Sequence, residues 1–270
     1  MPDLPASIRL VYHESEPHPR DVALPDVYLD LALPSGADGR PYLFVNMVQT
    51  LDGQAVLRGT AYSIGTDVDH YLLRQLRSNA DAVLSGAGTV RKDDVIITTH
   101  RHLRERRVQR GQPGNPLSVV VTATCTFSDD VLAQKKFFQR SDLHRLILTT
   151  RRAAPEDVTR VRARGVEVEM IGTDESGEVD LRSALAYLHE GRGVERLLCE
   201  GGPTLNVSLA RGGLLDELFL TTTLRLAGDP REPRIVSAPV TDRPLHLISE
   251  MHHADDSGVR EVYLRFRFPR

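Results

Sequence analysis

The sequence has no tryptophan, only two cysteines, and no apolar run long enough to cross a bilayer. Because a membrane-spanning helix needs roughly 20 consecutive apolar residues, we expect no membrane segment. The N-terminal stretch MPDLPASIRL lacks the apolar centre of a signal peptide. Cys125 and Cys199 each lie in or just after an apolar run, which favours buried free thiols over a disulfide. These absences predict a cytoplasmic protein.

Charge of one sign and several catalytic motifs are also missing. The chain has 34 Lys and Arg against 37 Asp and Glu, so we expect neither a nucleic-acid nor a membrane partner. The zinc-deaminase pair H-x-E and P-C-x-x-C is absent, and the histidines show no metal-ligand spacing, which predicts no metal site. The G-x-S-x-G elbow and the Walker-type phosphate loop are absent as well. The remaining features fit an enzyme whose cofactor carries the chemistry.

A glycine turn dominates the stretch 195–213. The apolar run 196–199 predicts a buried strand, the turn 200–204 contains Gly201 and Gly202, and Leu205 and Leu209 follow at helical spacing. Such a junction presents unpaired backbone N–H groups at a helix N-terminus, where a phosphate binds readily. The motif alone is equally compatible with an ordinary strand–turn–helix connection, since short glycine patterns are common.

A second junction of this kind lies at 80–90. The apolar run ADAVLS leads directly into Gly86-Ala87-Gly88-Thr89-Val90. Two strand–glycine–helix junctions in one chain predict a single ligand held at one edge of one sheet.

Alternating strands and helices indicate the fold class. Such alternation favours a parallel sheet covered by helices on both faces. In the last predicted strand, 259–268, apolar residues alternate with polar ones, which predicts an apolar edge that needs cover. We therefore predict an α/β protein with three α/β/α layers and a mostly parallel central sheet that ends in an antiparallel C-terminal hairpin. The predicted strands are 41–48, 80–85, 117–121, 143–150, 165–171, 195–199, 215–222, 245–251 and 259–268, and the predicted helices are 66–78, 128–140, 154–164 and 180–190.

Two segments show weak periodicity. Residues 1–40 are rich in proline and acidic residues, which predicts an N-terminal extended arm before a domain at 41–270. The arm would pack on the body or reach a partner. Residues 91–116 are polar and rich in arginine. We interpret them as a solvated surface loop, with phosphate binding by the arginines as the alternative.

Four blocks in this order resemble the reductase domain of the bacterial riboflavin-biosynthesis enzyme, the RibD C-terminal domain, in the dihydrofolate-reductase-like superfamily. They lie at 50–53, 76–94, 200–205 and 215–218. The resemblance spans most of residues 41–268. It implies an NADPH-dependent oxidoreductase that transfers a hydride to the ribosyl C1′ of 5-amino-6-(5-phosphoribosylamino)uracil or a similar heterocyclic substrate. It also implies a homodimer.

The resemblance places the cofactor at the two glycine junctions. Residues matching the family there are Gly86, Gly88, Thr89, Gly201, Gly202, Thr204 and Leu205. Thr122, Thr124 and Arg151 follow the third and fourth predicted strands, where such folds often meet the adenosine end. An arginine at the position of Arg151 can pair with a 2′-phosphate. A solvent-exposed arginine at the end of a strand, without a ligand, is an equally good interpretation.

The resemblance places the substrate beside the first strand. Asn46 and Thr50 match residues on the substrate side, and Asp94 matches an acid that contacts the ribose part. Glu200 precedes the second glycine pair, near the point of hydride delivery. We predict Asp94 and Glu200 as catalytic residues. The alternatives are that Asp94 stabilises a turn and that Glu200 is a solvated acid.

Three departures from the family pattern fall on the substrate side. Asn46 stands where the family commonly has Lys, which removes a cation, and residues 61–65 (AYSIG) replace S-x-W-I-T. Val95 replaces the proline of Asp-Asp-Pro. These changes keep two alternatives open: a dihydrofolate or pterin reductase of the same fold, and a non-catalytic nucleotide-binding protein.

Overall fold

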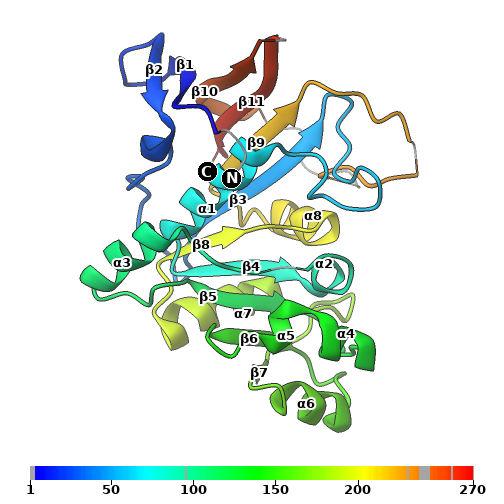
Figure 1. Ribbon diagram of the computed structural model, residues 1–270. Helices are drawn as coiled ribbons and strands as arrows, with labels where there is room; N and C mark the ends of the chain where they lie inside the picture. The colour runs from blue at the N-terminus through cyan, green and yellow to red at the C-terminus, as the bar shows by residue number, and fades with distance from the viewer. Residues whose placement is uncertain (1–3, 95, 230, 237–243, 257, 270) are drawn as a thin grey trace.

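Eleven strands of the described chain form one sheet (Figure 1). The computed structural model describes residues 4–94, 96–229, 231–236, 244–256 and 258–269, so Val95 lies outside the described residues. The strand order is β2-β1-β10-β11-β9-β3-β8-β4-β5-β6-β7. The strands are β1 (Ser7–His13), β2 (Arg20–Ala23), β3 (Tyr42–Thr50), β4 (Ala82–Gly86), β5 (Leu117–Val121), β6 (Arg145–Thr149), β7 (Glu167–Met170), β8 (Arg196–Cys199), β9 (Glu217–Thr223), β10 (His246–Asp255) and β11 (Gly258–Arg267).

The sheet has a parallel part and an antiparallel part. Neighbouring strands are parallel from β9 through β3, β8, β4, β5 and β6 to β7. β11 pairs antiparallel with both β9 and β10, which confirms the predicted C-terminal hairpin. The predicted fold class is therefore confirmed.

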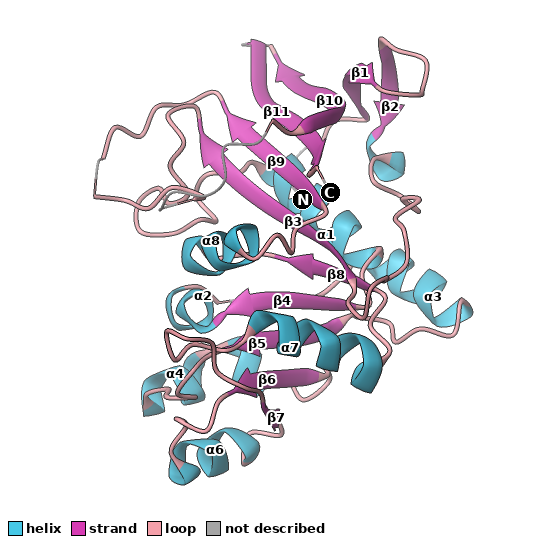
Figure 2. Ribbon diagram, turned by 180° about the vertical axis from the view of Figure 1, so that it is seen from behind, coloured by secondary structure: helices cyan, strands magenta, loops and turns pink. Residues whose placement is uncertain are grey.

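Helices cover both faces of the sheet (Figure 2). On β5, Val119 packs in one core cluster with Leu185 and Leu209, whereas Val120 packs in another with Phe137. Because successive side chains of a strand point to opposite faces, α7 and α8 cover one face and α5 covers the other. The helices are α1 (Asp67–Ser78), α2 (Ala87–Lys92), α3 (Arg101–Gln109), α4 (Asp129–Gln134), α5 (Lys136–Gln139), α6 (Pro155–Arg162), α7 (Leu181–Ala186) and α8 (Pro203–Arg211), with short turns η1 (Leu24–Asp26) and η2 (Tyr187–Gly191).

Helix α1 begins at the predicted cap. The Thr66 side chain accepts a hydrogen bond from the backbone N–H of Val68 at 3.2 Å. Leu72 and Leu76, one turn apart, are buried against the sheet in one core cluster with Phe44. An N-cap of this kind contributes about 1 kcal/mol, and the apolar stripe fixes which side of α1 faces away from the core.

The segment predicted as an extended arm contains a β-hairpin. β1 pairs antiparallel with β2 and with β10, so the sheet continues beyond the C-terminal hairpin. Ile8 and Leu10 are buried in the same core cluster as residues of α1. Short strands between prolines gave too little periodicity for sequence reasoning to detect this hairpin.

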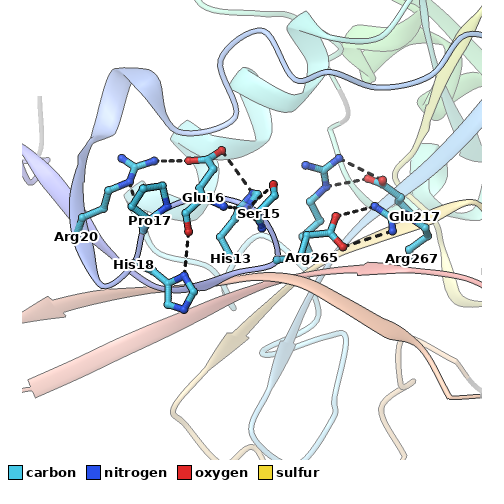
Figure 3. Close-up of polar contacts among 10 residues, drawn as sticks. His13, Ser15, Glu16, Pro17, His18, Arg20, Glu217, Arg265 and Arg267 are labelled. Carbon is cyan, nitrogen blue, oxygen red and sulfur yellow. Dashed lines mark hydrogen bonds and ion pairs between the residues drawn. The ribbon is translucent and has the colours of Figure 1, made fainter.

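Polar contacts close the connection between β1 and β2 (Figure 3). The backbone N–H groups of Ser15 and Glu16 donate to His13 Nδ1 at 3.2 and 3.1 Å, and Arg20 pairs with Glu16. Arg267 Nη2 donates to Glu14 Oε1 at 2.8 Å, which ties the hairpin to β11. These contacts hold the N-terminal hairpin at the antiparallel end of the sheet.

Strand β11 differs from the predicted apolar edge. It lies between β9 and β10, inside the sheet. Tyr263, which the alternation places on the polar face, is 1% exposed and Glu261 is 0% exposed, whereas Val262, Leu264 and Phe266 are only half-buried. The prediction was wrong because Glu261 and Tyr263 satisfy their polar atoms internally: the Tyr263 hydroxyl donates to Glu261 Oε2 at 2.5 Å.

The predicted loop at 91–116 contains helix α3. Arg107 on this helix is 2% exposed, so the expectation of solvated arginines was wrong for this residue. Its guanidinium donates to the carbonyl oxygens of Ser78, Ala80 and Pro113 at 2.9, 2.7 and 2.9 Å. The carbonyl groups of Ser78 and Ala80 lie at and just beyond the end of α1, where carbonyls have no N–H donor within the helix.

This geometry predicts that Arg107→Ala strongly destabilises the fold. Buried carbonyls that lose a charged donor remain unsatisfied, and we expect the free energy of unfolding in urea to fall by about 3 kcal/mol. Arg106 lies on the same helix as Arg107 and forms an exposed ion pair with Asp30. Arg106→Ala should lower the free energy of unfolding by less than about 1 kcal/mol. Equal effects of the two substitutions would contradict this assignment.

Candidate active site

The two glycine junctions lie against each other. β4 and β8 are parallel neighbours, so both junctions leave the same edge of the sheet. The Gly86 N–H donates to the Gly201 carbonyl oxygen at 2.8 Å. A Cβ at Gly202 would lie 3.2 Å from Thr89 Oγ1, and a Cβ at Gly88 would meet no atom within 4 Å. The two junctions therefore share one edge of the sheet, with little space at Gly202 and open space at Gly88.

A cavity of ≈ 620 Å³ lies next to these junctions. Its wall is contributed by β3, α1, the segment 55–62, α2 and the residues after it, and α5. Thr89 and Glu200 join it to the two junctions. The lining residues are Asn46, Met47, Val48, Ala55, Thr60, Ala61, Tyr62, Asp69, His70, Leu73, Arg74, Arg77, Thr89, Asp93, Asp94, Ile96, Thr98, Lys136 and Glu200.

One stripe of α1 supplies much of this wall. At roughly 3.6 residues per turn, its members form one arc of α1 that adjoins the side of the buried Leu72 and Leu76, with Asp69 nearest to that side. Arg74 is exposed, and no acidic partner contacts it among the residues that the structure describes. The stripe consists of Asp69, His70, Leu73, Arg74 and Arg77.

Glu200 is held by Arg77. Arg77 Nε and Nη2 donate to the two carboxylate oxygens of Glu200 at 2.6 and 2.7 Å, and Arg77 Nη1 donates to the Ile96 carbonyl at 2.9 Å. The side chains of this pair are 9% and 12% exposed. A two-pronged pair fixes orientation as well as charge. Glu200 is therefore an oriented hydrogen-bond acceptor rather than a solvated acid.

The two adjacent acids after α2 are also engaged. Asp94 accepts from the Lys136 backbone N–H at 2.8 Å, and its carboxylate lies 2.9 Å from Lys136 Nζ. Burial opposes ionisation of Asp94, but the hydrogen bonds from Lys136 outweigh it, and the pKa of Asp94 is lowered. Asp93 accepts from the Thr60 hydroxyl at 2.9 Å. Both carboxylates line the cavity as acceptors.

Asp69 differs from the other three carboxyls of the wall. It is 5% exposed. The pKa of Asp69 is raised to about 7, first because burial penalises the charged form and second because Glu261 is negatively charged. A hydrogen bond with Thr221 acts in the opposite direction. Within the described part of the chain, Asp69 forms no ion pair.

Not every residue predicted for the site reaches the cavity. Asn46, Thr89, Asp94 and Glu200 line it. Thr50 is fully buried: its hydroxyl donates to Asp52 at 2.6 Å and accepts from the Gln54 N–H at 3.0 Å, so it holds the turn. The remaining predicted residues lie at the carboxyl ends of the parallel strands, outside the cavity wall: Gly86, Gly88, Thr122, Thr124, Arg151, Gly201, Gly202, Thr204 and Leu205.

Other expectations concern the chain as a whole. Cys125 and Cys199 are buried and free, as predicted, and burial raises the pKa of the Cys125 thiol to about 11. Among the described residues, no cluster of three or more His, Cys, Asp or Glu side chains has the arrangement of a metal site. None of the helices described here is long and apolar enough to span a bilayer.

The sequence profile of the RibD C-terminal domain matches residues 41–260, which is most of the chain. The chain belongs to the RibD C-terminal domain family. Curated relatives support this membership. The 2,5-diamino-6-ribosylamino-4(3H)-pyrimidinone 5′-phosphate reductase of Archaeoglobus fulgidus is 35% identical over 181 residues, 66% of this chain and 78% of the relative. The enzyme of that name from Methanothermobacter thermautotrophicus is 35% identical over 191 residues, 70% of this chain and 80% of the relative.

Solved structures share the fold. A pyrimidine reductase-like protein from Corynebacterium diphtheriae superposes with a TM-score of 0.71 at 24% identity, covering 85% of this chain and 92% of that chain. The riboflavin biosynthesis reductase of Saccharomyces cerevisiae superposes with a TM-score of 0.63 at 17% identity, covering 91% and 98%. The protein is thus an oxidoreductase of the RibD C-terminal domain family, and reductases of this fold point to a nicotinamide cofactor.

Sequence reasoning missed several residues of the wall. It treated the loss of Lys at Asn46 as the loss of a cation, but Arg74, Arg77 and Lys136 bring cations to the cavity from α1 and α5. The charged stripe of α1 was visible as Asp69, Arg74 and Arg77 at helical spacing beside the apolar stripe. Lys136 carried no comparable signal, because only tertiary packing brings α5 to the cavity.

The raised pKa of Asp69 predicts that this carboxyl destabilises the fold as pH rises, whereas a carboxyl with a lowered pKa stabilises it. The folded pKa of about 7 lies above the ordinary 3.8, so the folded state binds this proton more tightly, and the stability contributed by the proton is lost as pH rises through 7. Asp69→Asn prevents this loss of stability because the asparagine amide does not ionise. At about 1.4 kcal/mol per pKa unit, we expect the variant to gain about 1–4 kcal/mol at pH 8.

The measurement is urea unfolding of both proteins from pH 4 to pH 8. The difference between them should shrink toward pH 4. Asp67→Asn, at the exposed first position of the same helix, is the matched control and should show no such gain at pH 8. A difference for Asp69→Asn that does not change with pH would contradict the assignment.

Proposed function

We propose that this protein uses NADPH to reduce the ribosyl group of a ribosylamino-pyrimidine phosphate to a ribityl chain. The substrate favoured by the names of its relatives is 2,5-diamino-6-ribosylamino-4(3H)-pyrimidinone 5′-phosphate. The observation that carries the proposal is the cavity of ≈ 620 Å³, with charged groups of both signs, directly beside two glycine junctions. The uracil form, 5-amino-6-(5-phosphoribosylamino)uracil, differs at the pyrimidine ring and is the main alternative.

The residues at the junctions fit a dinucleotide. α8 begins at Pro203 with Gly202 as its N-cap, so unpaired backbone N–H groups and the positive end of the helix dipole face the strand edge. No side chain obstructs Gly88 within 4 Å. We assign the pyrophosphate to this edge, with Thr89, Thr204 and Leu205 beside it. When bound, NADPH supplies the hydride. Thr122, Thr124 and Arg151 follow β5 and β6 in the direction of the adenosine end, and the exposed Arg151 is available for a 2′-phosphate.

The residues of the cavity fit the substrate. Arg74 and Lys136 are cations suited to the 5′-phosphate, while Asn46 and Glu200 offer the amide and carboxylate that an amino-pyrimidine ring recognises. Arg77 positions Glu200 for that task. Asp93 and Asp94 are acceptors suited to the ribose hydroxyls. Since Glu200 and Asp94 are both paired with cations, we assign them to binding and orientation of the reacting sugar.

Turnover with defined substrates tests this function. The purified protein is mixed with NADPH and, in turn, the diamino-pyrimidinone phosphate, the uracil phosphate and dihydrofolate, and NADPH oxidation is followed by absorbance. We expect oxidation with the diamino-pyrimidinone phosphate. Oxidation with dihydrofolate alone would move the protein to the folate alternative, and oxidation with none of the three would contradict the function.

The cofactor edge has its own test. Gly202→Asp places a side chain and a negative charge at the N-terminus of α8, and we expect it to weaken NADPH binding at least about 100-fold in a fluorescence titration, which is about 2.7 kcal/mol. Ser208→Asp adds the same charge to an exposed position of the same helix and should bind NADPH like the wild type. Unchanged binding by a folded Gly202→Asp protein would show that the dinucleotide lies elsewhere.

We also propose a homodimer that uses the half-buried apolar face of β11, with Val262, Leu264 and Phe266. Apolar patches on a folded surface commonly mark interfaces. Light scattering should give twice the chain mass of 30.0 kDa for the wild type and the single mass for Leu264→Glu. Met170→Glu, on the edge strand β7 at the other end of the sheet, should remain dimeric. A monomeric wild type would contradict the proposal.

A further inference from the structure

Asp69 lines the cavity, and the proposed function gives it no part in binding or orienting the substrate. We propose that Asp69 is the proton donor of the reduction, an inference that rests on the proposed function. Four observations support this role: the position of the carboxyl, the residues that surround it, the engagement of the other acids, and the proton that the reaction consumes.

The position of Asp69 depends on a residue that departs from the family. A Cβ at Gly65 would lie 2.1 Å from Asp69 Oδ2 and 2.7 Å from its Cγ, so only glycine leaves room for this carboxyl. Gly65 stands where the S-x-W-I-T segment of the family has threonine. Gly65 and Asp69 are four residues apart and act as a unit. The altered segment 61–65 thus creates space for an acid at the wall of the cavity.

The surroundings of Asp69 keep a proton on it. Glu261 on β11 is fully buried and accepts from Thr66 N, Thr66 Oγ1 and Tyr263 Oη at 2.7, 2.5 and 2.5 Å, an arrangement suited to a carboxylate. Its charge and the burial of Asp69 both favour the protonated acid, which raises the pKa of Asp69 to about 7. The N-terminus of α1 and the bond with Thr221 act against this, without reversing it.

The other ionisable groups near Asp69 do not replace it. Burial lowers the pKa of His70, its neighbour on α1, so this imidazole is neutral near pH 7. Burial and the charge of Glu261 raise the pKa of Tyr263, and burial raises that of Tyr28, so both phenols are poor acids. His253 on β10 faces Glu261, with Nδ1 3.8 Å from its Oε2.

The remaining carboxyls of the wall are already engaged by hydrogen-bond donors. Glu200 is paired with Arg77 and Asp94 with Lys136, and the hydrogen bonds from Lys136 lower the pKa of Asp94 against the effect of burial. Asp93 accepts from the Thr60 hydroxyl. Asp69 is thus the wall carboxyl whose surroundings favour the acid.

The reaction needs one proton for each turnover. In the open form of the substrate, the sugar carbon and the ring-bound nitrogen share a C=N bond. The hydride brings its electron pair to the carbon, and the π pair of the C=N bond moves to the nitrogen. The nitrogen takes the proton of Asp69, an N–H bond forms and the O–H bond of the acid breaks. The carboxylate regains a proton from solvent, and the nicotinamide is the species oxidised.

A pH–rate profile tests the assignment. The donor must be protonated, so kcat of the wild type should fall about tenfold per pH unit above pH 7, and Asp69→Asn should lower kcat about 100-fold and remove this dependence. Asp67→Asn, on the same helix, should keep the wild-type profile. Gly65→Ala, which displaces the carboxyl, should resemble Asp69→Asn. A kcat and a profile for Asp69→Asn that match the wild type would overturn the proposal.

Two further readouts separate this inference from the proposed function and from misfolding. Infrared titration of the free protein should show the C=O band of a protonated carboxyl that disappears near pH 7 and is absent from Asp69→Asn. NADPH affinity should be the same in both proteins. If the wild type reduces the pyrimidine phosphate but lacks this band, the inference fails and the function stands. If the band is present but the protein does not reduce the pyrimidine phosphate, the proposed function is wrong, and the role of Asp69 as proton donor is wrong as well.

Discussion

The position of β8 between β3 and β4 is the constraint on which the site depends. β8 lies more than a hundred residues after its two neighbours in the chain, yet its backbone pairs with both. That pairing brings the second glycine junction against the first, where the Gly86 N–H donates a hydrogen bond to the Gly201 carbonyl. It also carries Glu200 to Arg77. Parallel strands end at one edge of the sheet, so protein groups from segments distant in sequence come together there.

Helix α1 connects this edge to the rest of the molecule. One face packs Leu72 and Leu76 into the core, and the adjoining face presents charged groups to the cavity. Its N-terminus is tied to β11 through Thr66 and Glu261, and its C-terminus is held by Arg107 from α3. Desolvated ion pairs contribute little net stability. Arg77 and Glu200 therefore serve mainly orientation, while the apolar face of α1 and its anchored ends supply the rigidity.

Local patterns in the sequence were sufficient to predict the parallel strands and the glycine junctions. Continuous apolar runs identified the strands, and glycine after a strand identified the junctions. Pairing across the chain was not visible. Alternation in β11 suggested a polar face that includes Tyr263, but Tyr263 is buried because its hydroxyl donates a hydrogen bond to the buried Glu261. Arg107 looked like a surface residue, because composition does not reveal that free carbonyls at the end of α1 need a donor.

The departures from the family pattern also acquire a physical meaning only in three dimensions. Asn46 suggested that a cation was missing, but Lys136 and Arg74 reach the same cavity from other elements. Gly65 suggested a weakened motif, but a larger residue there would collide with Asp69. The cations that line this cavity thus come from elements remote in sequence from Asn46. The chemistry of the cavity depends on its total charge and shape, so loss of single motif residues is a poor argument for loss of activity.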